Sequence, residues 1–350
     1  MTQQEKKENN QSARANVEEN GLEAAAHNKR PVRRGTSRRN PERQTKSAQA
    51  STVSAKEQPA KQTMSKEGRT ASPRRSSRGR QVRKTPVKII SLGGLGEIGK
   101  NIYVYECSND IIIVDCGLAF PDDEMLGVDL VIPDFTYLER NREKIRGIFL
   151  THGHEDHIGA VPYLLKKLNV PVYATRLTLG LLEGKLVEHG ILSSTQLNVV
   201  KPKDIVKAGC MAVEFIRVNH SIPDACAMAI HTPAGVIIHT GDFKVDYSPI
   251  QGEIIDLARF GELGSRGVLA LLGESTNAER PGSTTSERKV GETFETLFNR
   301  AEKKRIIIAT FASNVDRVQQ IISAAVRHGR KVAISGRSMG TAAATALERG

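Results

Sequence analysis

The residues that most clearly suggest chemistry lie at 151–157, where the chain reads Thr-His-Gly-His-Glu-Asp-His. Neutral imidazole and carboxylate groups are the ligands that hold Zn²⁺ and similar transition metals in proteins. Two histidines at positions i and i+2 lie on the same side of an extended segment, so both can face one ion. The Asp-His pair that follows can serve a second ion. The candidate ligands of this motif are His152, His154, Asp156 and His157.

Two later positions can complete such a site. His220 follows the apolar stretch 213–218, and Asp242 follows the apolar run 236–238. In both cases an expected strand ends in a polar ligand, which is how a sheet gathers ligands that are distant in sequence. His239 is a rival ligand, although within its strand it can face the other way. Taken singly, each of these residues fits a surface or capping role equally well.

The excess positive charge is confined to residues 1–87. They hold 21 Lys and Arg against 8 Asp and Glu, whereas the rest of the chain holds 30 against 31. The segment has no Phe, Tyr or Trp, so it cannot bury enough apolar surface to offset the entropy of ordering. We predict a disordered tail over 1–86 whose arginine clusters tether nucleic acid through its phosphates. A solubilising tail without a partner is the alternative.

Chain length, hydropathy and cysteine spacing indicate where the protein is located. The 350 residues are enough for more than one domain, and no apolar stretch reaches the ~18 residues that a membrane span needs. The N-terminus is polar, so no signal peptide is expected. The four cysteines have no CxxC spacing and are expected to be reduced thiols. These features predict a cytoplasmic protein with no membrane association.

Apolar periodicity and turn residues divide the chain from residue 87 onward into a strand-rich part and an alternating part. The later alternation of strand and helix is typical of a parallel α/β unit. Strands are expected at 87–92, 101–107, 111–115, 145–151, 170–174, 212–218, 226–231, 235–240, 268–273, 305–310 and 331–335. Helices are expected at 158–168, 177–189, 290–303, 315–327 and from 340 onward.

A glycine-rich segment at 94–99 matches the pattern G-x-G-x-x-G of dinucleotide-binding folds, and Asp115 lies about 20 residues later. That fold needs a helix directly after the glycines. Here residues 101–106 read Asn-Ile-Tyr-Val-Tyr-Glu, which favours a strand. We therefore predict that the glycines form a tight loop between paired strands.

The pattern His-x-His-x-Asp-His, followed by a strand-end histidine and Thr-Gly-Asp, resembles the metallo-β-lactamase superfamily. The chain is more narrowly similar to the ribonuclease J family of the β-CASP branch at 91–101, 150–159, 240–244, 274–282 and 309–320. The resemblance implies an α/β (α+β) fold, with a four-layer αββα sandwich and the start of an inserted β-CASP α/β domain. The expected domains are a tail at 1–86, a metallo-β-lactamase domain at 87–285 and part of a β-CASP domain at 286–350.

The resemblance also implies roles for individual residues. His152, His154 and His220 would bind one metal ion, Asp156 and His157 would bind another, and Asp242 would bridge the two. Asp115 would orient the histidines from behind, with a strand-end cap as the alternative. Glu274 would be the acidic residue of the first β-CASP motif, and it is expected to be catalytic, as are Asp156 and Asp242. Ser313 and Asn314 would contact the substrate phosphate, with capping of the next helix as the alternative.

The activity implied by the resemblance is metal-dependent hydrolysis of RNA. It comprises 5′→3′ exonuclease and endonuclease action in RNA maturation and decay, with a preference for 5′-monophosphate ends. The expected cofactors are two Zn²⁺ ions per full-length subunit, with Mn²⁺ or Mg²⁺ as alternatives. The expected partners are further copies of the chain, as a dimer or tetramer, and an RNA-degradation complex. Family members continue beyond Gly350, so the chain is expected to be a C-terminally truncated fragment whose second metal site is incomplete.

Two other functions remain open from the sequence. One is a different hydrolase on the same fold, such as a β-lactamase, a glyoxalase or a small phosphodiesterase. The basic residues after Glu274, namely Arg280, Arg288, Lys289, Lys303, Lys304 and Arg305, argue for a nucleic-acid substrate instead. The other is a non-catalytic RNA-binding paralogue. The intact ligand motif argues against it, because a scaffold does not need six metal ligands.

The tail hypothesis predicts an effect of deleting residues 1–87 on RNA affinity. The deletion is expected to weaken RNA binding and to flatten its salt dependence, since each lost phosphate contact changes the slope of log affinity against log salt by about 0.7 for a single strand. Hydrolysis is expected to persist. Fluorescence anisotropy over a salt series measures the slope, and an unchanged slope would show that the tail is no tether.

Overall fold

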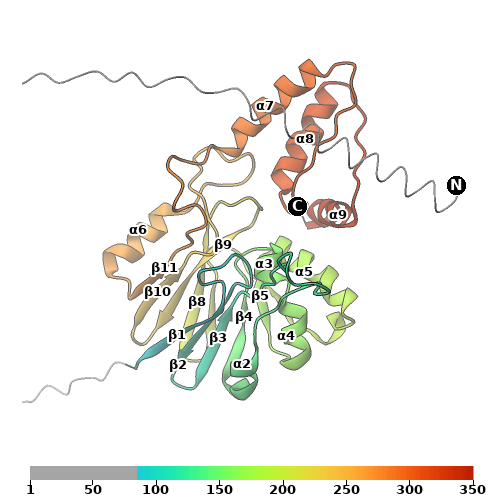
Figure 1. Ribbon diagram of the computed structural model, residues 1–350. Coiled ribbons are helices and arrows are strands. Elements are labelled where there is room, and N and C mark those ends of the chain that lie inside the picture. Colours follow the sequence, from blue (N-terminus) through green and yellow to red (C-terminus); the bar gives the residue numbers. More distant parts are fainter. Residues whose placement is uncertain (1–84, 350) are drawn as a thin grey trace, which may run out of the picture. The chain divides into compact units, whose positions relative to one another are not determined.

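The computed structural model describes residues 85–349 (Figure 1). The predicted tail at 1–86, with its arginine clusters, falls outside this range except for Thr85 and Pro86. The strands are β1 (Val87–Gly93), β2 (Ile102–Cys107), β3 (Asp110–Val114), β4 (Ile145–Phe149), β5 (Val172–Ala174), β6 (Leu197–Val199), β7 (Ile205–Ala208), β8 (Met211–Arg217), β9 (Cys226–Thr232), β10 (Gly235–His239) and β11 (Ala270–Leu272). The α-helices are α2 (Thr136–Arg140), α3 (Glu155–Ile158), α4 (Val161–Lys167), α5 (Arg176–Glu188), α6 (Leu257–Arg266), α7 (Glu287–Arg300), α8 (Val315–Arg327) and α9 (Arg337–Arg349).

The strands form two sheets. The first has the order β1-β2-β3-β4-β5-β6, antiparallel as far as β3 and parallel from β3 onward. The second has the order β11-β10-β9-β8-β7 and is antiparallel except for the parallel pair of β10 and β11. The glycine loop at 94–99 joins the antiparallel strands β1 and β2, so the expected tight loop is confirmed and no dinucleotide-binding helix follows it.

The two sheets pack face to face, and β3 shows why. Its residues are apolar on both sides, and successive side chains point to opposite faces of a strand. Ile112 and Val114 join a core with Phe215 and Met228 of the second sheet, whereas Ile111 and its neighbour Ile113 face the other way. These four side chains of β3 are fully buried. A strand buried on both faces therefore lies at the centre of a layered fold.

Helices cover the two outer faces. Leu164 of α4 and Leu182 of α5 are buried in the cluster that contains Ile111. Leu263 of α6 packs with Ala229 on the outer face of the second sheet. The layers are therefore helix, sheet, sheet and helix, which confirms the expected αββα sandwich (Figure 1). Among the described residues, no helix is both long enough and apolar enough to span a membrane.

The segment after β11 is helical. Phe294 and Phe298 of α7 pack against Ala324 and Ala325 of α8, which makes a separate small core. Two expected strands are absent from the described residues, because 305–310 and 331–335 belong to neither sheet. A run of β-branched residues indicates a segment that can join a sheet. A strand forms only where a neighbouring strand provides the backbone hydrogen bonds.

A polar network joins α7 to the sandwich. Asp246, which is 5% exposed, lies 3.0 Å from the hydroxyl of Ser286, the N-cap of α7. The next residue, Glu287, accepts two hydrogen bonds from the guanidinium of Arg317 in α8, at 2.7 and 3.0 Å. Lys244 lies 3.9 Å from the carboxylates of both Asp246 and Glu287. The network therefore links α7 and α8 to Lys244, which lies two positions after Asp242.

A backbone clamp encloses the motif at 154–157, and it is formed by the turns before β2 and after β3. Cys116 N donates to His157 O at 2.8 Å, Asn101 N to Asp156 O at 3.0 Å, and Leu118 N to Glu155 O at 3.1 Å. Gly117 lies at the tightest point, because a Cβ there would stand 1.6 Å from the carbonyl oxygen of Asp156. Only glycine fits this position.

The clamp predicts that Gly117→Ala destabilises the fold. The added methyl group has to displace a backbone carbonyl, and overpacking of this kind costs about 3 kcal/mol of unfolding free energy. Gly184→Ala in α5 is the matched control, since nothing lies within 4 Å of a Cβ there. The free energy of unfolding of Gly184→Ala is expected to rise by roughly 0.5–1 kcal/mol, because alanine has a higher helix propensity than glycine. Urea denaturation followed by circular dichroism gives both values; equal stabilities would contradict the clamp.

Candidate metal centre

Three imidazoles meet where β4 and β8 end. His152 and His154 follow β4, and His220 follows β8. The Nδ1 atom of His154 lies 3.0 Å from Nε2 of His152 and 3.2 Å from Nε2 of His220. Two nitrogens that bind one tetrahedral ion at 2.0–2.1 Å are about 3.3 Å apart. The spacing of the three rings therefore fits a divalent cation between them.

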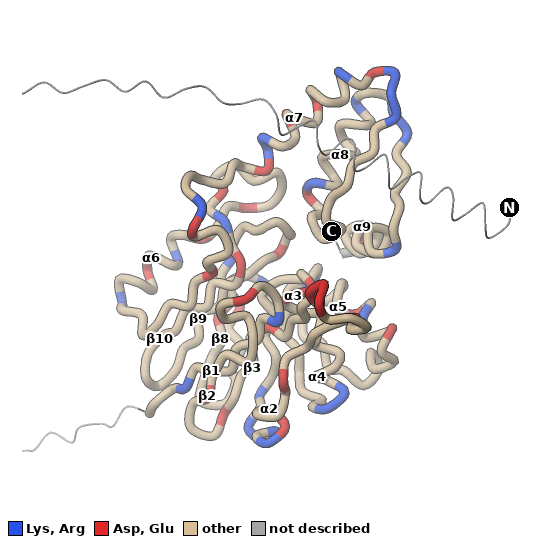
Figure 2. The backbone as a smooth tube through the Cα atoms, viewed as in Figure 1, with Lys and Arg blue, Asp and Glu red and all other residues tan. Residues whose placement is uncertain are grey.

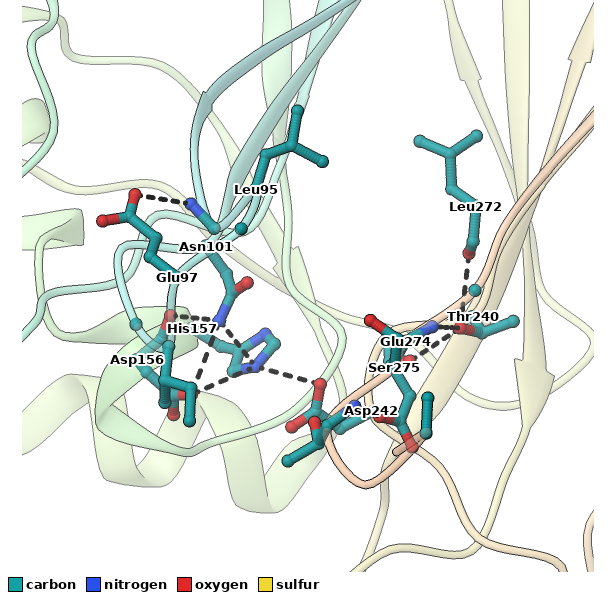
Figure 3. Close-up of a pocket in the computed structure, with 18 of the residues that line it drawn as sticks. Leu95, Glu97, Asn101, Asp156, His157, Thr240, Asp242, Leu272, Glu274 and Ser275 are labelled. Carbon is teal, nitrogen blue, oxygen red and sulfur yellow. Dashed lines mark hydrogen bonds and ion pairs between the residues drawn. The ribbon is translucent and has the colours of Figure 1, made fainter. Parts of the chain in front are cut away.

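A second group of ligand atoms shares His152 with the first. His152, His157 and Asp242 each offer one atom, and these atoms lie within 4.8 Å of one another. Oδ2 of Asp156 lies 3.6 Å from Nε2 of His157, and Oδ1 of Asp242 lies 3.5 Å from it (Figure 3). The six predicted ligands thus come together at one edge of the two sheets. Asp156 belongs to neither of the two tightest triads in the described residues.

Asp115 lies behind the ligands. Its carboxylate accepts hydrogen bonds from the backbone N and the hydroxyl of Thr151, at 2.7 and 2.8 Å, and lies 2.8 Å from Nδ1 of His157. Its backbone has the left-handed φ of 59°, which a non-glycine residue adopts only when its surroundings impose it. A carboxylate on one ring nitrogen fixes the tautomer and turns the other nitrogen, Nε2, toward the ligand cluster.

Two ligand segments are joined directly to each other. The backbone N of Lys244 donates to the carbonyl oxygen of Asn219 at 2.7 Å, in an isolated β-bridge. His220 directly follows Asn219, and Asp242 comes two residues before Lys244. The side chain of Asn219 also binds Glu253 O and Ile255 N, so it holds a third loop in place.

Burial keeps three of the imidazoles neutral. Desolvation is the main cause that holds the pKa of His152 well below its usual value, that lowers the pKa of His154, and that lowers the pKa of His220 to about 3. The positive charge that each ring would bring to its neighbours acts in the same direction. A neutral imidazole has the free lone pair that a metal ion needs.

His157 and Asp242 instead have pKa values that favour their charged forms, because the two side chains pair. Burial alone would lower the pKa of His157, but the charge of Asp115 and its hydrogen bond, with Asp242 in addition, hold it well above its usual value. Burial alone would raise the pKa of Asp242, yet His157 lowers it. In chelated protein, a proton on His157 would offset the charges of Asp115 and Asp242. A divalent cation can replace this proton, as it does at other metal sites.

A pocket of about 650 Å³ opens beside the second group of ligands. The glycine loop at 94–99 forms one wall, and residues 273–280 form another, with His157 and Asp242 between them (Figure 3). Glu274 also lines the pocket, and its backbone N donates to the Thr240 hydroxyl at 3.3 Å. Glu274 therefore lies at the same pocket as His157 and Asp242, and its catalytic role stays a prediction.

The two predicted phosphate-contact residues do not line the pocket. Asn314 is 4% exposed, and its side chain accepts from Arg317 N as the N-cap of α8. Ser313 O accepts from Val315 N at 2.9 Å. The helix-capping alternative is thus present in the structure, and phosphate contact at these residues stays a prediction.

Sequence reasoning missed Asn101 and Thr151. Nδ2 of Asn101 donates to the backbone oxygen of Asp156 at 3.1 Å and lies 3.2 Å from Nε2 of His157. Thr151 holds Asp115 as described above. Neither residue stands in a ligand pattern. The only available signals were their positions, one directly after the glycine loop and one directly before His152.

Comparisons with known proteins agree with this geometry. The Metallo-beta-lactamase superfamily matches residues 95–280, and the Ribonuclease J beta-CASP domain matches residues 303–350. A crystal structure of a protein of unknown function from Enterococcus faecalis superposes with a TM-score of 0.53 and 20% identity, covering 67% of this chain and 62% of that one. At this identity the likeness supports the fold alone.

Curated relatives are more similar in sequence. Ribonuclease J of Synechocystis sp. is 52% identical over 72% of this chain and 40% of its own length. Ribonuclease J2 of Bacillus subtilis is 49% identical over 72% of this chain and 45% of its own, and Ribonuclease J of Thermus thermophilus is 48% identical over 75% and 47%. The chain thus spans less than half the length of each of these relatives. It belongs to the metallo-β-lactamase superfamily and, within it, to the ribonuclease J family of the β-CASP branch.

Proposed function

We propose that this chain carries the metal centre of a metal-dependent ribonuclease that hydrolyses RNA phosphodiester bonds. The observation that carries the proposal is the convergence of His152, His154, His157, His220 and Asp242 in two overlapping triads beside an open pocket. The relatives named ribonuclease J support RNA as the substrate.

Zn²⁺ is the proposed ion, because four imidazoles among six ligands favour a borderline-soft cation over Mg²⁺. We propose two ions: His152, His154 and His220 would hold one, Asp156 and His157 would hold the other, and Asp242 would be a further ligand. When bound, they supply Lewis acidity that lowers the pKa of water to about 7 and neutralises phosphate charge.

The chain's own residues supply position and proton transfer. Asp115 fixes the ring of His157, and the backbone clamp fixes the main chain that carries His154 and Asp156. The Glu274 carboxylate lines the same pocket, and we propose it as the general acid that serves the leaving 3′ oxygen. When the bond between phosphorus and the 3′ oxygen is hydrolysed, the products carry a 5′-phosphate and a 3′-hydroxyl.

Exposed basic residues support a nucleic-acid substrate over a small β-lactam or thioester. Arg280 lines the pocket and is exposed. Lys303, Lys304 and Arg305 are exposed as well and gather in the loop after α7 (Figure 2). Clustered cations attract phosphates by releasing counterions. A smaller substrate would need no positive surface beyond the pocket.

The finer features are also proposals. They are combined 5′→3′ exonuclease and endonuclease action, a preference for 5′-monophosphate ends, a dimer or tetramer, participation in an RNA-degradation complex, and a cytoplasmic location. The four cysteines are free thiols in the structure, as a reducing compartment requires. We also propose that the boundary between the metallo-β-lactamase and β-CASP parts lies near residue 285, just before the Ser286 cap of α7.

The proposed centre predicts loss of hydrolysis in His154→Ala and Asp156→Ala. Each removes a metal ligand, so turnover of a 5′-labelled RNA is expected to fall at least about 100-fold, the scale of electrostatic stabilisation in such sites. Zinc measured by plasma mass spectrometry is expected to fall in parallel. Glu155→Ala is the matched control, since that side chain is paired with Lys185 on the surface. Full activity in Asp156→Ala would refute the centre.

The depressed histidine pKa values predict that the chelated protein loses stability as pH falls. Below about pH 6.5 the histidines of the unfolded chain are protonated. In the folded chain His152, His154 and His220 stay neutral, so the unfolded state binds more protons and unfolding becomes more favourable. The raised pKa of His157 does not oppose this trend, because its stabilisation is fully present below 6.5 and is lost only at higher pH.

Chemical denaturation between pH 7 and pH 5 measures this effect. His220→Asn is expected to have a shallower pH dependence than the wild type, because one group with a pKa of about 3 is gone. The same slope in both proteins would show that His220 is not held neutral by the fold.

A further inference from the structure

His239 is a buried residue to which neither the metal centre nor the proposed reaction gives a role. It ends β10 and is 6% exposed. It belongs to neither triad of converging ligand atoms in the described residues. It nevertheless lines the same pocket as Asp156, His157 and Asp242. A ring with two polar nitrogens therefore stands beside the expected position of the substrate.

One ring nitrogen of His239 is fixed by the opposite sheet. Its Nδ1 lies 2.8 Å from the hydroxyl oxygen of Tyr105, which is fully buried in β2. This hydroxyl has no other hydrogen-bond partner in the described part of the chain, and a buried O–H without an acceptor is unfavourable. Burial also raises the pKa of Tyr105, so the hydroxyl keeps its proton. Tyr105 therefore donates to Nδ1, and the hydrogen of the neutral ring is on Nε2.

The other nitrogen is open to the pocket. Nε2 of His239 has no hydrogen-bond partner within 85–349. It is not among the fully buried unpartnered side-chain atoms of that range, which are His189 Nδ1 and Thr310 Oγ1. Its free face is therefore on the pocket side. Tyr103 packs edge-on against the ring, with centroids 5.0 Å apart, and holds its plane.

We propose that His239 binds the substrate, with its Nε2–H donating a hydrogen bond to a non-bridging oxygen of the RNA phosphate in the pocket. This inference rests on the proposed function. A hydrogen bond to an anionic oxygen is stronger than one between neutral groups. A donor that is already oriented where negative charge grows contributes most in the transition state.

The neutral state of the ring suits this role. Burial lowers the pKa of His239 to about 4, so the ring carries no charge near pH 7. A lysine or arginine at this point would repel divalent cations held by Asp242, three residues along the chain. A neutral N–H binds the phosphate without that repulsion.

A pair of substitutions separates the two ring nitrogens. The amide nitrogen of an asparagine reaches the place of Nδ1, whereas that of a glutamine reaches the place of Nε2. In the metal-loaded full chain, His239→Asn is expected to lower kcat/KM on a 5′-monophosphorylated RNA by about 10–100-fold, the scale of one hydrogen bond to a charged group. The metal content is expected to stay unchanged, and His239→Gln is expected to recover most of the rate. His189→Asn, outside the pocket, is the matched control.

A phosphorothioate substrate gives a readout that a structural role would not move. Sulfur in place of the contacted oxygen weakens the hydrogen bond in the wild type. In His239→Asn that bond is already lost, so the rate penalty of one of the two sulfur diastereomers is expected to be smaller than in the wild type. Equal penalties in both proteins for both diastereomers, or an unchanged kcat/KM in His239→Asn, would overturn the assignment.

Nitrogen NMR of histidine-labelled protein tests the tautomer without catalysis. Nε2 of His239 is expected to carry the proton, Tyr105→Phe is expected to perturb the Nδ1 resonance, and the dinucleotide UpU is expected to shift Nε2. A proton on Nδ1 would overturn the inference. If the wild type hydrolyses no RNA, the proposed function fails; the His239 assignment fails with it only if UpU also leaves Nε2 unmoved.

Discussion

The hydrogen bonds that the turns before β2 and after β3 donate to the main chain of 155–157 are the constraint on which the metal centre depends. They satisfy carbonyl groups of α3, a helix of only four residues that is too short to satisfy all of them itself. The side chains of Asp156 and His157 are then free to face the pocket. Gly117 makes the contact feasible, because any side chain there would push the two segments apart.

Asp115 adds the second constraint, which acts on side-chain orientation. One carboxylate accepts from Thr151 twice and pairs with His157, so a single residue connects the strand that leads into the motif with the helix that leaves it. Its left-handed backbone places the carboxylate there. These contacts hold the ligand side chains in position, which reduces the ordering that metal binding has to impose.

Much of this arrangement was predictable from local patterns. The ligand motif, the strand alternation and the absence of a helix after the glycines are all short-range features, and the structure has the expected layers. The helix expected at 158–168 was only partly right, because the helical stretch is interrupted between α3 and α4. There Ala160 N donates to Cys116 O at 2.9 Å instead of to Asp156 O, which accepts from Asn101 N. The interruption depends on residues more than forty positions away, which no short window of sequence contains.

Other features depended on partners that sequence cannot show. Residues 305–310 have strand-like composition, but no neighbouring strand in the described chain. Asn101 and Tyr105 act through contacts with residues 55 to 134 positions away. The local sequence around them is ordinary, so only the folded chain identifies them. Asn314 differs from these residues, because its preference for helix caps is a local property that the sequence shows. In the structure it is the N-cap of α8.

The short bridge between Asn219 and Lys244 has a mechanical consequence. Because one carbonyl of the His220 segment is tied to one amide of the Asp242 segment, neither can swing outward without pulling on the other. Lys244 in turn reaches the polar network at the start of α7. Displacing these helices would therefore strain both metal-bearing turns at once, so the two cation positions are expected to loosen or tighten together rather than independently.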